Sequence, residues 1–208
     1  MDKEQFKLAL SQKLKAGLPG YEAQRLMEPP MRNTFELDSS KAKKAATVLI
    51  LYFEEEWKFI LIRRSSHPLD KHKGQIGFPG GSIEKGEKAN DAAIREANEE
   101  IGISSDKFEL VGKLSDLFIP VSNFLVMPYV AFGEVKIDEL IKEEAEVDEI
   151  ISIKLNDLLD SNRVQKKSMR MANGMNINDI PYFDIDGLEI WGATAMMLSE
   201  FREIVKGM

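Results

Sequence analysis

Apolar residues recur at helical spacing near the start of the chain. From residue 3 to residue 16 they alternate with polar residues as an amphipathic helix requires, and Gly17 predicts the end of that helix. The next segment, 18–33, is rich in proline, and we expect it to be irregular and to wrap over the core. The candidate buried residues of the predicted helix are Phe6, Leu8, Leu10 and Leu14.

Two continuous apolar runs follow, at 45–53 and 57–63. Runs of this length, rich in β-branched and aromatic residues, predict buried strands, and the acidic turn between them predicts a hairpin. Similar patterns predict three further strands, at 108–118, 124–132 and 147–153.

The last third of the chain mixes short helical and strand patterns. Residues 154–161 predict a short helix, and the Asn173-Gly174 pair is a strong hairpin-turn signal. A short strand is expected at 181–185, and an amphipathic helix at 192–207 closes the chain. With no internal repeat and no low-complexity linker, the pattern favours one α/β domain with an N-terminal helical arm.

Composition restricts the classes of partner. The chain has 208 residues and a net charge of -7, which argues against nucleic acid because phosphate backbones require a cationic surface. A small anionic substrate stays possible if divalent cations offset the charge. The sequence has no cysteine and no long apolar run near its start, so we expect a cytoplasmic protein without a membrane partner.

The segment 80–103, GGSIEKGEKANDAAIREANEEIGI, predicts an unusually acidic helix. Asn90 or Asp91 is expected to cap its start, and Gly102 is expected to end it in a left-handed conformation. On a helical wheel the apolar face that would pack on a sheet is formed by Ile94, Ala97 and Ile101. The opposite side, within an arc of roughly 100°, is formed by Glu96, Glu99 and Glu100.

Clustered carboxylates on one short surface repel one another, so the pattern calls for a compensating charge. A hard divalent cation binds oxygen ligands of this kind and leaves positions for water and a substrate phosphate. Arg95 lies four residues before Glu99 and can form an ion pair with it, and the Gly80-Gly81 pair allows close backbone approach. A merely solvated acidic face is the alternative interpretation, but it leaves the glycines, the arginine and the spacing unexplained.

This segment resembles the signature of the Nudix hydrolases, which runs Gly, five residues, Glu, seven residues, then Arg-Glu-apolar-x-Glu-Glu-x-Gly-apolar. The matching residues are Gly81, Glu87, Arg95, Glu96, Ala97, Glu99, Glu100, Gly102 and Ile103.

The resemblance implies a Nudix α/β/α sandwich with a mixed sheet, formed by residues 45–208, preceded by a helical arm over 1–44. It also implies hydrolysis of a diphosphate with Mg²⁺ or Mn²⁺. In that family pattern Glu96 and Glu100 would be the main metal ligands, with Glu99 sharing that role or assisting the base. The remaining roles fall to Arg95 and Glu87, which would orient these carboxylates, and to the Gly80 carbonyl, which would complete the metal's ligands.

The flanking residues resemble the coenzyme A diphosphatase branch of the family. That branch carries an Arg-Ser pair followed by His-x-Gly-Gln-apolar-x-Phe-Pro-Gly-Gly, and an Ile-Trp-Gly-Ala-Thr-Ala stretch matches at 190–195. Here the spacing from Arg64 to Gly74 is one residue longer than the branch pattern, and Asp70 replaces Arg or a small residue. The residues implied to bind substrate are Arg64, Ser65, His72, Lys73, Gln75 and Phe78.

A physical argument supports the same loop without the family. Basic residues are concentrated there in an otherwise acidic protein, and coenzyme A carries a 3′-phosphate that requires a cationic contact besides its diphosphate. The basic residues are Arg63, Arg64, Lys71, His72 and Lys73. The apolar residues that could line a pantetheine or adenine pocket, or belong to the core, are Phe78, Phe124, Met127 and Trp191.

Two questions stay open at this stage. Glu146 and Glu99 are both candidates for the general base, and either a monomer or a homodimer is compatible with the sequence. The leading function is a metal-dependent coenzyme A diphosphatase. The alternatives are hydrolysis of another nucleoside diphosphate derivative, such as ADP-ribose or NADH, and a non-catalytic Nudix-like binding domain.

Overall fold

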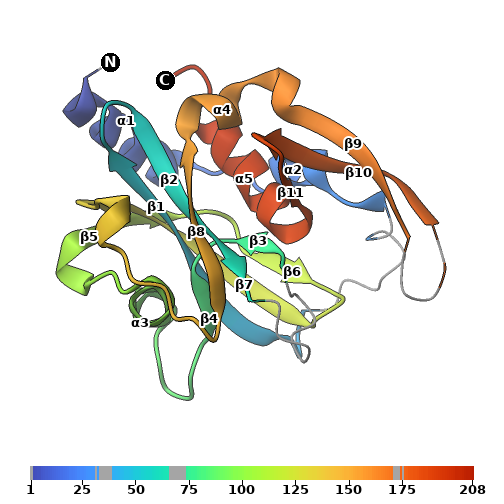
Figure 1. The fold of residues 1–208 in the computed structure, drawn as a ribbon, viewed down its shortest axis with the longest axis horizontal. Helices are drawn as coiled ribbons and strands as arrows, with labels where there is room; N and C mark the ends of the chain where they lie inside the picture. The colour runs from blue at the N-terminus through green and yellow to red at the C-terminus, as the bar shows by residue number, and fades with distance from the viewer. Residues whose placement is uncertain (1, 31, 33–38, 66–73, 171–173, 175) are drawn as a thin grey trace.

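The protein folds around a mixed β-sheet that separates two layers of helices (Figure 1). The structure is a computed structural model that describes residues 2–30, 32, 39–65, 74–170, 174 and 176–208. The strands of the main sheet are β1 (Lys43–Phe53), β2 (Trp57–Arg64), β3 (Ile76–Gly77), β4 (Gly80–Ser82), β5 (Phe108–Lys113), β6 (Leu117–Ile119), β7 (Phe124–Gly133) and β8 (Val147–Lys154). The α-helices are α1 (Lys3–Ala16), α2 (Tyr21–Gln24), α3 (Ala89–Ile101), α4 (Leu155–Leu159) and α5 (Gly192–Val205).

A second, antiparallel sheet lies beside α5 and contains β9 (Val164–Arg170), β10 (Asn176–Ile185) and β11 (Leu188–Trp191), with β10 in the middle. Short 3₁₀ turns complete the described elements: η1 (Arg25–Met27), η3 (Ser105–Lys107), η4 (Ile137–Glu139) and η5 (Ser161–Arg163). No helix within the described ranges is long and apolar enough to cross a membrane.

Strand β1 is the centre of the main sheet. It pairs antiparallel with β2 and β4 and parallel with β7. Its alternate residues enter two different cores: Val48 and Ile50 pack with α3, whereas Leu49 and Leu51 pack with α1 and α5. A strand that is buried on both faces reads as a continuous apolar run, which explains the strong sequence signal here. The predicted mixed sheet between helices is confirmed.

The N-terminal helix belongs to the main core. Phe6 lies 4.7 Å, between ring centroids, from Trp57 and 6.4 Å from Phe132. Leu10 and Leu14 are also buried, but Leu8 is 62% exposed, so the prediction that it is buried was wrong. Leu8 lies about 200° around the helix from Phe6 and therefore faces solvent.

Two other expectations from the pattern needed correction. The single strand predicted over 108–118 is divided into β5 and β6, because the backbone N–H of Ser115 between them bonds the Glu200 carboxylate instead of β7. Helix α3 begins after Lys88, which is its N-cap without a side-chain hydrogen bond, so neither Asn90 nor Asp91 is the cap.

The remaining elements follow the predictions closely. Gly102 ends α3 with a φ of 67°, in the left-handed region. Strands β9 and β10 form the expected hairpin, although Asn173 of its turn lies outside the described residues. The predicted helices over 154–161 and 192–207 are α4 and α5.

A buried carboxylate joins the arm to the C-terminal helix. Glu200 of α5 is fully buried, and its oxygens accept hydrogen bonds from the Gly20 N–H at 3.1 Å and the Gln24 amide at 2.8 Å. Ser115, between β5 and β6, adds its backbone N–H and its hydroxyl. Such donors replace the water that the charge loses on burial. Glu200 therefore fixes three separate segments relative to one another.

Replacing Glu200 with Gln should destabilise the protein by about 2 kcal/mol or more, because an amide N–H₂ then faces donors that had bonded a carboxylate oxygen. Urea unfolding followed by circular dichroism measures the loss. The matched control is Glu203→Gln on the same helix, where an i,i+3 pair with Lys206 at 3.5 Å is lost. That change should stay within about 0.5 kcal/mol. Equal losses in both variants would contradict the role given to Glu200.

Candidate active site

The acidic helix is held tightly against strand β4 by two glycines. Gly80 pairs with Thr47 of β1, and a Cβ on Gly80 would overlap the carbonyl oxygen of Ala46. A Cβ on Gly81 would overlap the carboxylate of Glu96. Since any larger residue would displace either the strand or the carboxylate, the Gly-Gly pair is required for this close approach.

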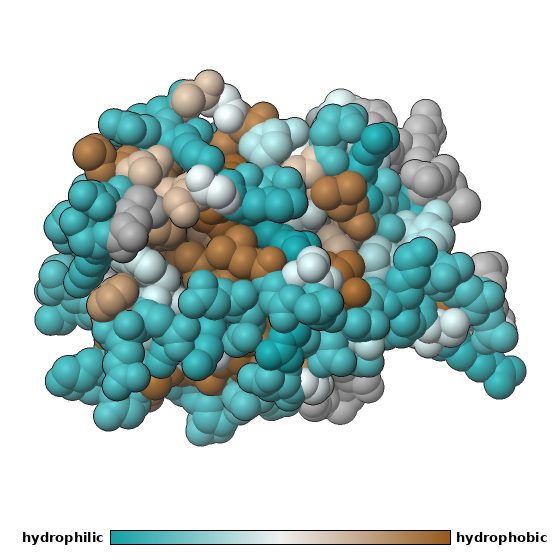
Figure 2. All heavy atoms as spheres, turned by 90° about the horizontal axis from the view of Figure 1, so that it is seen from above, coloured by the Kyte–Doolittle hydropathy of each residue, from teal (hydrophilic) through white to brown (hydrophobic). Residues whose placement is uncertain are grey.

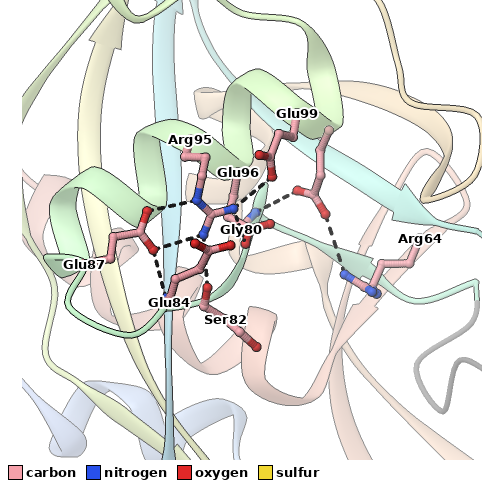
Figure 3. A network of polar contacts seen from close by, with 9 residues as sticks. Arg64, Gly80, Ser82, Glu84, Glu87, Arg95, Glu96 and Glu99 are labelled. Atoms are coloured by element: carbon pink, nitrogen blue, oxygen red, sulfur yellow. Dashed lines mark hydrogen bonds and ion pairs between the residues drawn. The ribbon is translucent and has the colours of Figure 1, made fainter.

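Arg95 is the centre of the polar network (Figure 3). Its Nε and Nη2 bond both oxygens of Glu87, at 2.9 and 3.1 Å. Its Nη1 bonds Glu96 at 2.9 Å and Glu99 at 2.8 Å, while Nη2 also reaches the Ser82 carbonyl at 3.1 Å. The predicted Arg95–Glu99 ion pair is confirmed, and one planar guanidinium orients three carboxylates.

Glu87 connects this network to the loop before the helix. Its second oxygen also accepts the backbone N–H of Glu84 at 2.9 Å. The hydrogen bonds from Arg95 and from this N–H hold the pKa of Glu87 below its ordinary value. The Glu87 carboxylate therefore stays charged and holds the loop and Arg95 in a fixed relation.

Glu100 differs from the other glutamates of the helix because it is buried. Only 1% of the residue is exposed, although the helical wheel placed it on the side away from the sheet. Strand β4 covers that side, and the Gly80 N–H donates to Glu100 at 2.7 Å. Arg64 of β2 approaches the other oxygen at 3.7 Å. Burial raises the pKa of Glu100 to about 8, against the opposing effects of Gly80 and Arg64.

Glu96 also has a raised pKa. Burial is the main cause, the charges of Glu99 and Glu146 add to it, and Arg95 opposes it. Glu100 is buried and Glu96 is partly buried, and the pKa values of both carboxyl groups are raised. A bound cation would favour the charged form of both groups.

The oxygen atoms at this site are of the type that a hard divalent cation binds. Carboxylate oxygens on a rigid helix and carbonyl oxygens on the adjoining strand are the ligands that Mg²⁺ and Mn²⁺ take. Across the described part of the chain, no three acidic or histidine side chains are grouped as a metal centre. Arg95 holds Glu96 and Glu99, and the Gly80 N–H holds Glu100.

Glu146 lies next to this site on the segment that leads into β8. Its carbonyl oxygen accepts the Ser65 N–H at 2.8 Å, which ties it to the end of β2. Its side chain is exposed, and its charge raises the pKa values of both Glu96 and Glu100. Both candidate bases, Glu99 and Glu146, are therefore near the buried carboxylates.

The residues expected to bind substrate are only partly brought together. Arg64 approaches Glu100 at 3.7 Å, and its backbone N–H donates to the Gln75 carbonyl at 3.0 Å. The backbone N–H of Ser65 donates to the Glu146 carbonyl at 2.8 Å. Phe78 is a correction: it is buried in the core on the α5 side of the sheet, so its ring is not presented to a ligand. His72 and Lys73 lie outside the described residues.

The other apolar candidates for a substrate pocket differ in their burial. Phe124 is partly buried and packs against the core, whereas Trp191 directly precedes α5 and is partly exposed. One positioning contact was missed from sequence: the Thr194 hydroxyl donates to the Ile76 carbonyl at 2.9 Å and ties α5 to β3. Its signal lay in the Ile-Trp-Gly-Ala-Thr-Ala stretch, which was noted only as a resemblance.

An apolar hollow on the face that carries the chain termini is separate from this site (Figure 2). It includes none of the signature residues. Its lining residues are Phe6, Phe53, Glu56, Trp57, Leu155, Asn156, Leu159, Val205 and Met208.

Strand β4 with its Gly-Gly pair and helix α3 hold an Arg-centred set of glutamates, which is the arrangement of a phosphate-anhydride hydrolase of the Nudix type. The NUDIX domain model matches residues 43–172, and the chain belongs to this family. Members generally use divalent metals such as Mg²⁺ or Mn²⁺.

Relatives along most of the chain agree with this assignment. Nudix hydrolase 3 of Caenorhabditis elegans is 27% identical over 187 residues, covering 83% of this chain and 78% of the relative. A mitochondrial coenzyme A diphosphatase of Mus musculus is 26% identical over 182 residues, covering 87% of this chain and 86% of the relative. The solved MutT/nudix family protein of Enterococcus faecalis shares the fold, with a TM-score of 0.51, 19% identity, and coverage of 99% of this chain and 75% of that one. The protein is therefore a Nudix hydrolase.

The ordinary pKa of Glu100 is 4.5, and its pKa in the folded protein is about 8. Without a divalent cation, the free energy of unfolding should therefore fall as the pH rises through this range. In this range Glu100 is protonated in the folded chain and ionised in the unfolded chain, so unfolding releases a proton. Glu100→Gln removes that dependence. The variant should match the wild type near pH 5 and exceed it by a few kcal/mol at pH 8, at about 1.4 kcal/mol per pKa unit.

Urea unfolding in EDTA across this pH range measures the difference. Glu99→Gln is the matched control, because its side chain is 56% exposed on the same helix. Its profile should follow the wild type. A constant gap between Glu100→Gln and the wild type at every pH would show that Glu100 does not carry the effect.

Proposed function

We propose that the protein hydrolyses the diphosphate bond of coenzyme A, and of acyl-coenzyme A, to 3′,5′-ADP and the corresponding 4′-phosphopantetheine. The observation that carries this proposal is the similarity to a coenzyme A diphosphatase along 87% of the chain. The Arg-Ser and Gly-Gln-x-x-Phe-Pro-Gly-Gly residues that precede the helix support it, because the Nudix signature alone does not require them.

In this proposal Glu96, Glu99 and Glu100 hold Mg²⁺ or Mn²⁺, and Arg95 and Glu87 keep the carboxylates oriented. The cation would neutralise phosphate oxygens and activate water for attack on phosphorus. Arg95 would then give up part of its contact with Glu96 and Glu99. Its pair with Glu87, which uses two hydrogen bonds, keeps its guanidinium in place.

The Gly80 carbonyl is a fitting additional ligand. The Gly80 N–H donates to Glu100 at 2.7 Å, so Gly80 lies beside the acidic cluster. The lack of a Cβ at Gly81 leaves room for the Glu96 carboxylate next to it.

The geometry supports Glu146 over Glu99 as the general base. Arg95 holds Glu99 at 2.8 Å, so this side chain is already fixed in the network of the signature helix. Glu146 is exposed and tied to β2 only through its backbone, so its side chain can reach a water beside the phosphate. Arg64, Ser65, Gln75, His72 and Lys73 are proposed to contact the substrate.

ADP-ribose or NADH is the alternative substrate class. Either would use the same carboxylates, and neither carries a 3′-phosphate. Product identity therefore separates the two proposals, whereas loss of activity in a glutamate variant would not.

Incubation of the protein with coenzyme A and Mg²⁺ or Mn²⁺ should release 3′,5′-ADP and 4′-phosphopantetheine, resolved by chromatography. Glu100→Gln should lower the rate by at least about 100-fold, because a buried ligand oxygen is lost. ADP-ribose and NADH are run in parallel. Hydrolysis of ADP-ribose and NADH, with no hydrolysis of coenzyme A, would overturn the proposed substrate and leave the proposed metal site in place. Binding without turnover of any substrate would favour the non-catalytic domain.

Arg95→Lys should lower kcat by about 10- to 100-fold, the usual effect of losing a residue that orients metal ligands. A lysine keeps the charge but cannot bond Glu87 through two nitrogens while reaching Glu96 and Glu99. Steady-state rates across a Mn²⁺ titration measure this. Arg63→Lys, which alters a single 3.0 Å pair with Glu149, is the control and should change kcat less than about twofold. Similar losses in both variants would contradict the orienting role.

A further inference from the structure

A second polar cluster lies on the small sheet, away from the signature helix. Tyr182 of β10 and Trp191 of β11 are direct cross-strand partners. Their neighbours Phe183 and Ile190 form the next pair and are fully buried in the core. Because side chains alternate between the faces of a sheet, the two rings lie on the outer face.

Lys167 of β9 covers both rings. Its Nζ lies 5.3 Å from the centroid of Tyr182 and 5.2 Å from that of Trp191, and it pairs with Glu189 at 2.7 Å. Only 15% of its side chain is exposed, compared with 67% for the adjacent Lys166. A lysine withdrawn this far onto an outer sheet face, against two aromatic rings, differs from an ordinary solvated one.

The fold brings this cluster towards the signature site. Trp191 precedes the first turn of α5, where the Thr194 hydroxyl bonds the carbonyl of Ile76 in β3. Strand β3 contacts β11 and pairs with β2 (Figure 1). The β2 residue next to this pairing is Arg64, which approaches Glu100. Two residues separate the end of β3 from Gly80, the first residue of β4. The cluster and the acidic site thus lie on the two sides of one short strand.

We infer that Lys167, Tyr182 and Trp191 form the subsite for the adenine and 3′-phosphate of the substrate. The inference rests on the proposed function and deepens it. On binding, the Lys167 ammonium would turn from the rings to the phosphate, which it contacts as a point charge, and the ring faces it leaves would stack on the purine. The diphosphate would lie at the acidic helix beside Arg64, and the inference moves the 3′-phosphate contact from the basic loop, where the sequence argument put it, to Lys167.

Replacing Glu189 should have the opposite effect on phosphate binding from replacing Lys167, which gives a second test of the inference. Glu189 occupies one of the donors of Lys167, and its negative charge opposes a phosphate at the same position. Removing that charge should strengthen phosphate binding, whereas a cluster that only stabilises the sheet would gain nothing from the change.

The experiment is calorimetric titration of the full chain with 3′,5′-ADP and with 5′-AMP, which lacks the 3′-phosphate. Lys167→Met should weaken 3′,5′-ADP binding about tenfold and leave 5′-AMP within about twofold, the size of one charged contact. Trp191→Leu should weaken both nucleotides, and Glu189→Gln should tighten 3′,5′-ADP. Lys166→Met is the matched control and should change neither nucleotide.

Equal effects of Lys167→Met and Lys166→Met, or an equal loss for both nucleotides in Lys167→Met, would overturn the subsite. Thermal melting of each variant separates lost binding from lost folding. A further outcome is that the wild type hydrolyses coenzyme A while Lys167→Met leaves 3′,5′-ADP binding unaffected. That pair of results overturns the subsite and supports the proposed function. If the wild type does not hydrolyse coenzyme A, the proposed function fails, and the nucleotide titrations still decide the subsite.

Discussion

The burial of Glu100 beneath strand β4 is the constraint on which the site depends. A carboxylate that is almost fully removed from water is costly unless donors or a cation compensate it. The Gly80 N–H supplies one donor, and Arg64 supplies a distant charge. This compensation is incomplete, as the raised pKa of Glu100 shows. The fold therefore holds a buried acid in the setting where a cation contributes most.

Arg95 makes this arrangement possible for the neighbouring acids. Four glutamates near one short helix would repel one another, but a single guanidinium bonds Glu87, Glu96 and Glu99. Its pair with Glu87 does not compete with metal binding, because Glu87 lies on the loop before the helix and also bonds the Glu84 N–H. In the proposed function, a cation would replace part of the contact of Arg95 with Glu96 and Glu99, and the pair with Glu87 would keep the guanidinium in place.

Local signals in the sequence predicted most of the elements. Strand β1 is buried on both faces, so its apolar run was unambiguous, and Gly102 ended the acidic helix where its left-handed conformation is required. The errors at Glu100 and Phe78 involve contacts between distant segments, whereas those at Leu8 and at the start of α3 are local. The helical wheel placed Glu100 opposite the sheet, because nothing in the helix shows that β4 returns to cover it. Phe78 was assigned to the substrate on its motif alone, but the turn into β4 directs it into the core.

The position of Glu200 shows why the arm is more than an appendage. Its carboxylate fixes Gly20 and Gln24 of the arm to Ser115, which lies two residues before β6. Strand β6 pairs with the start of β7, β7 runs parallel to β1, and β1 pairs with β4, where Thr47 lies opposite Gly80. The arm is therefore connected through β6, β7 and β1 to β4, the strand that holds the acidic helix. Since α5 carries Thr194 in its first turn and Glu200 six residues later, the same helix positions strand β3 and the arm. The rigidity of the site then depends on α5 as much as on the signature helix itself, although α5 contributes no residue to the acidic cluster.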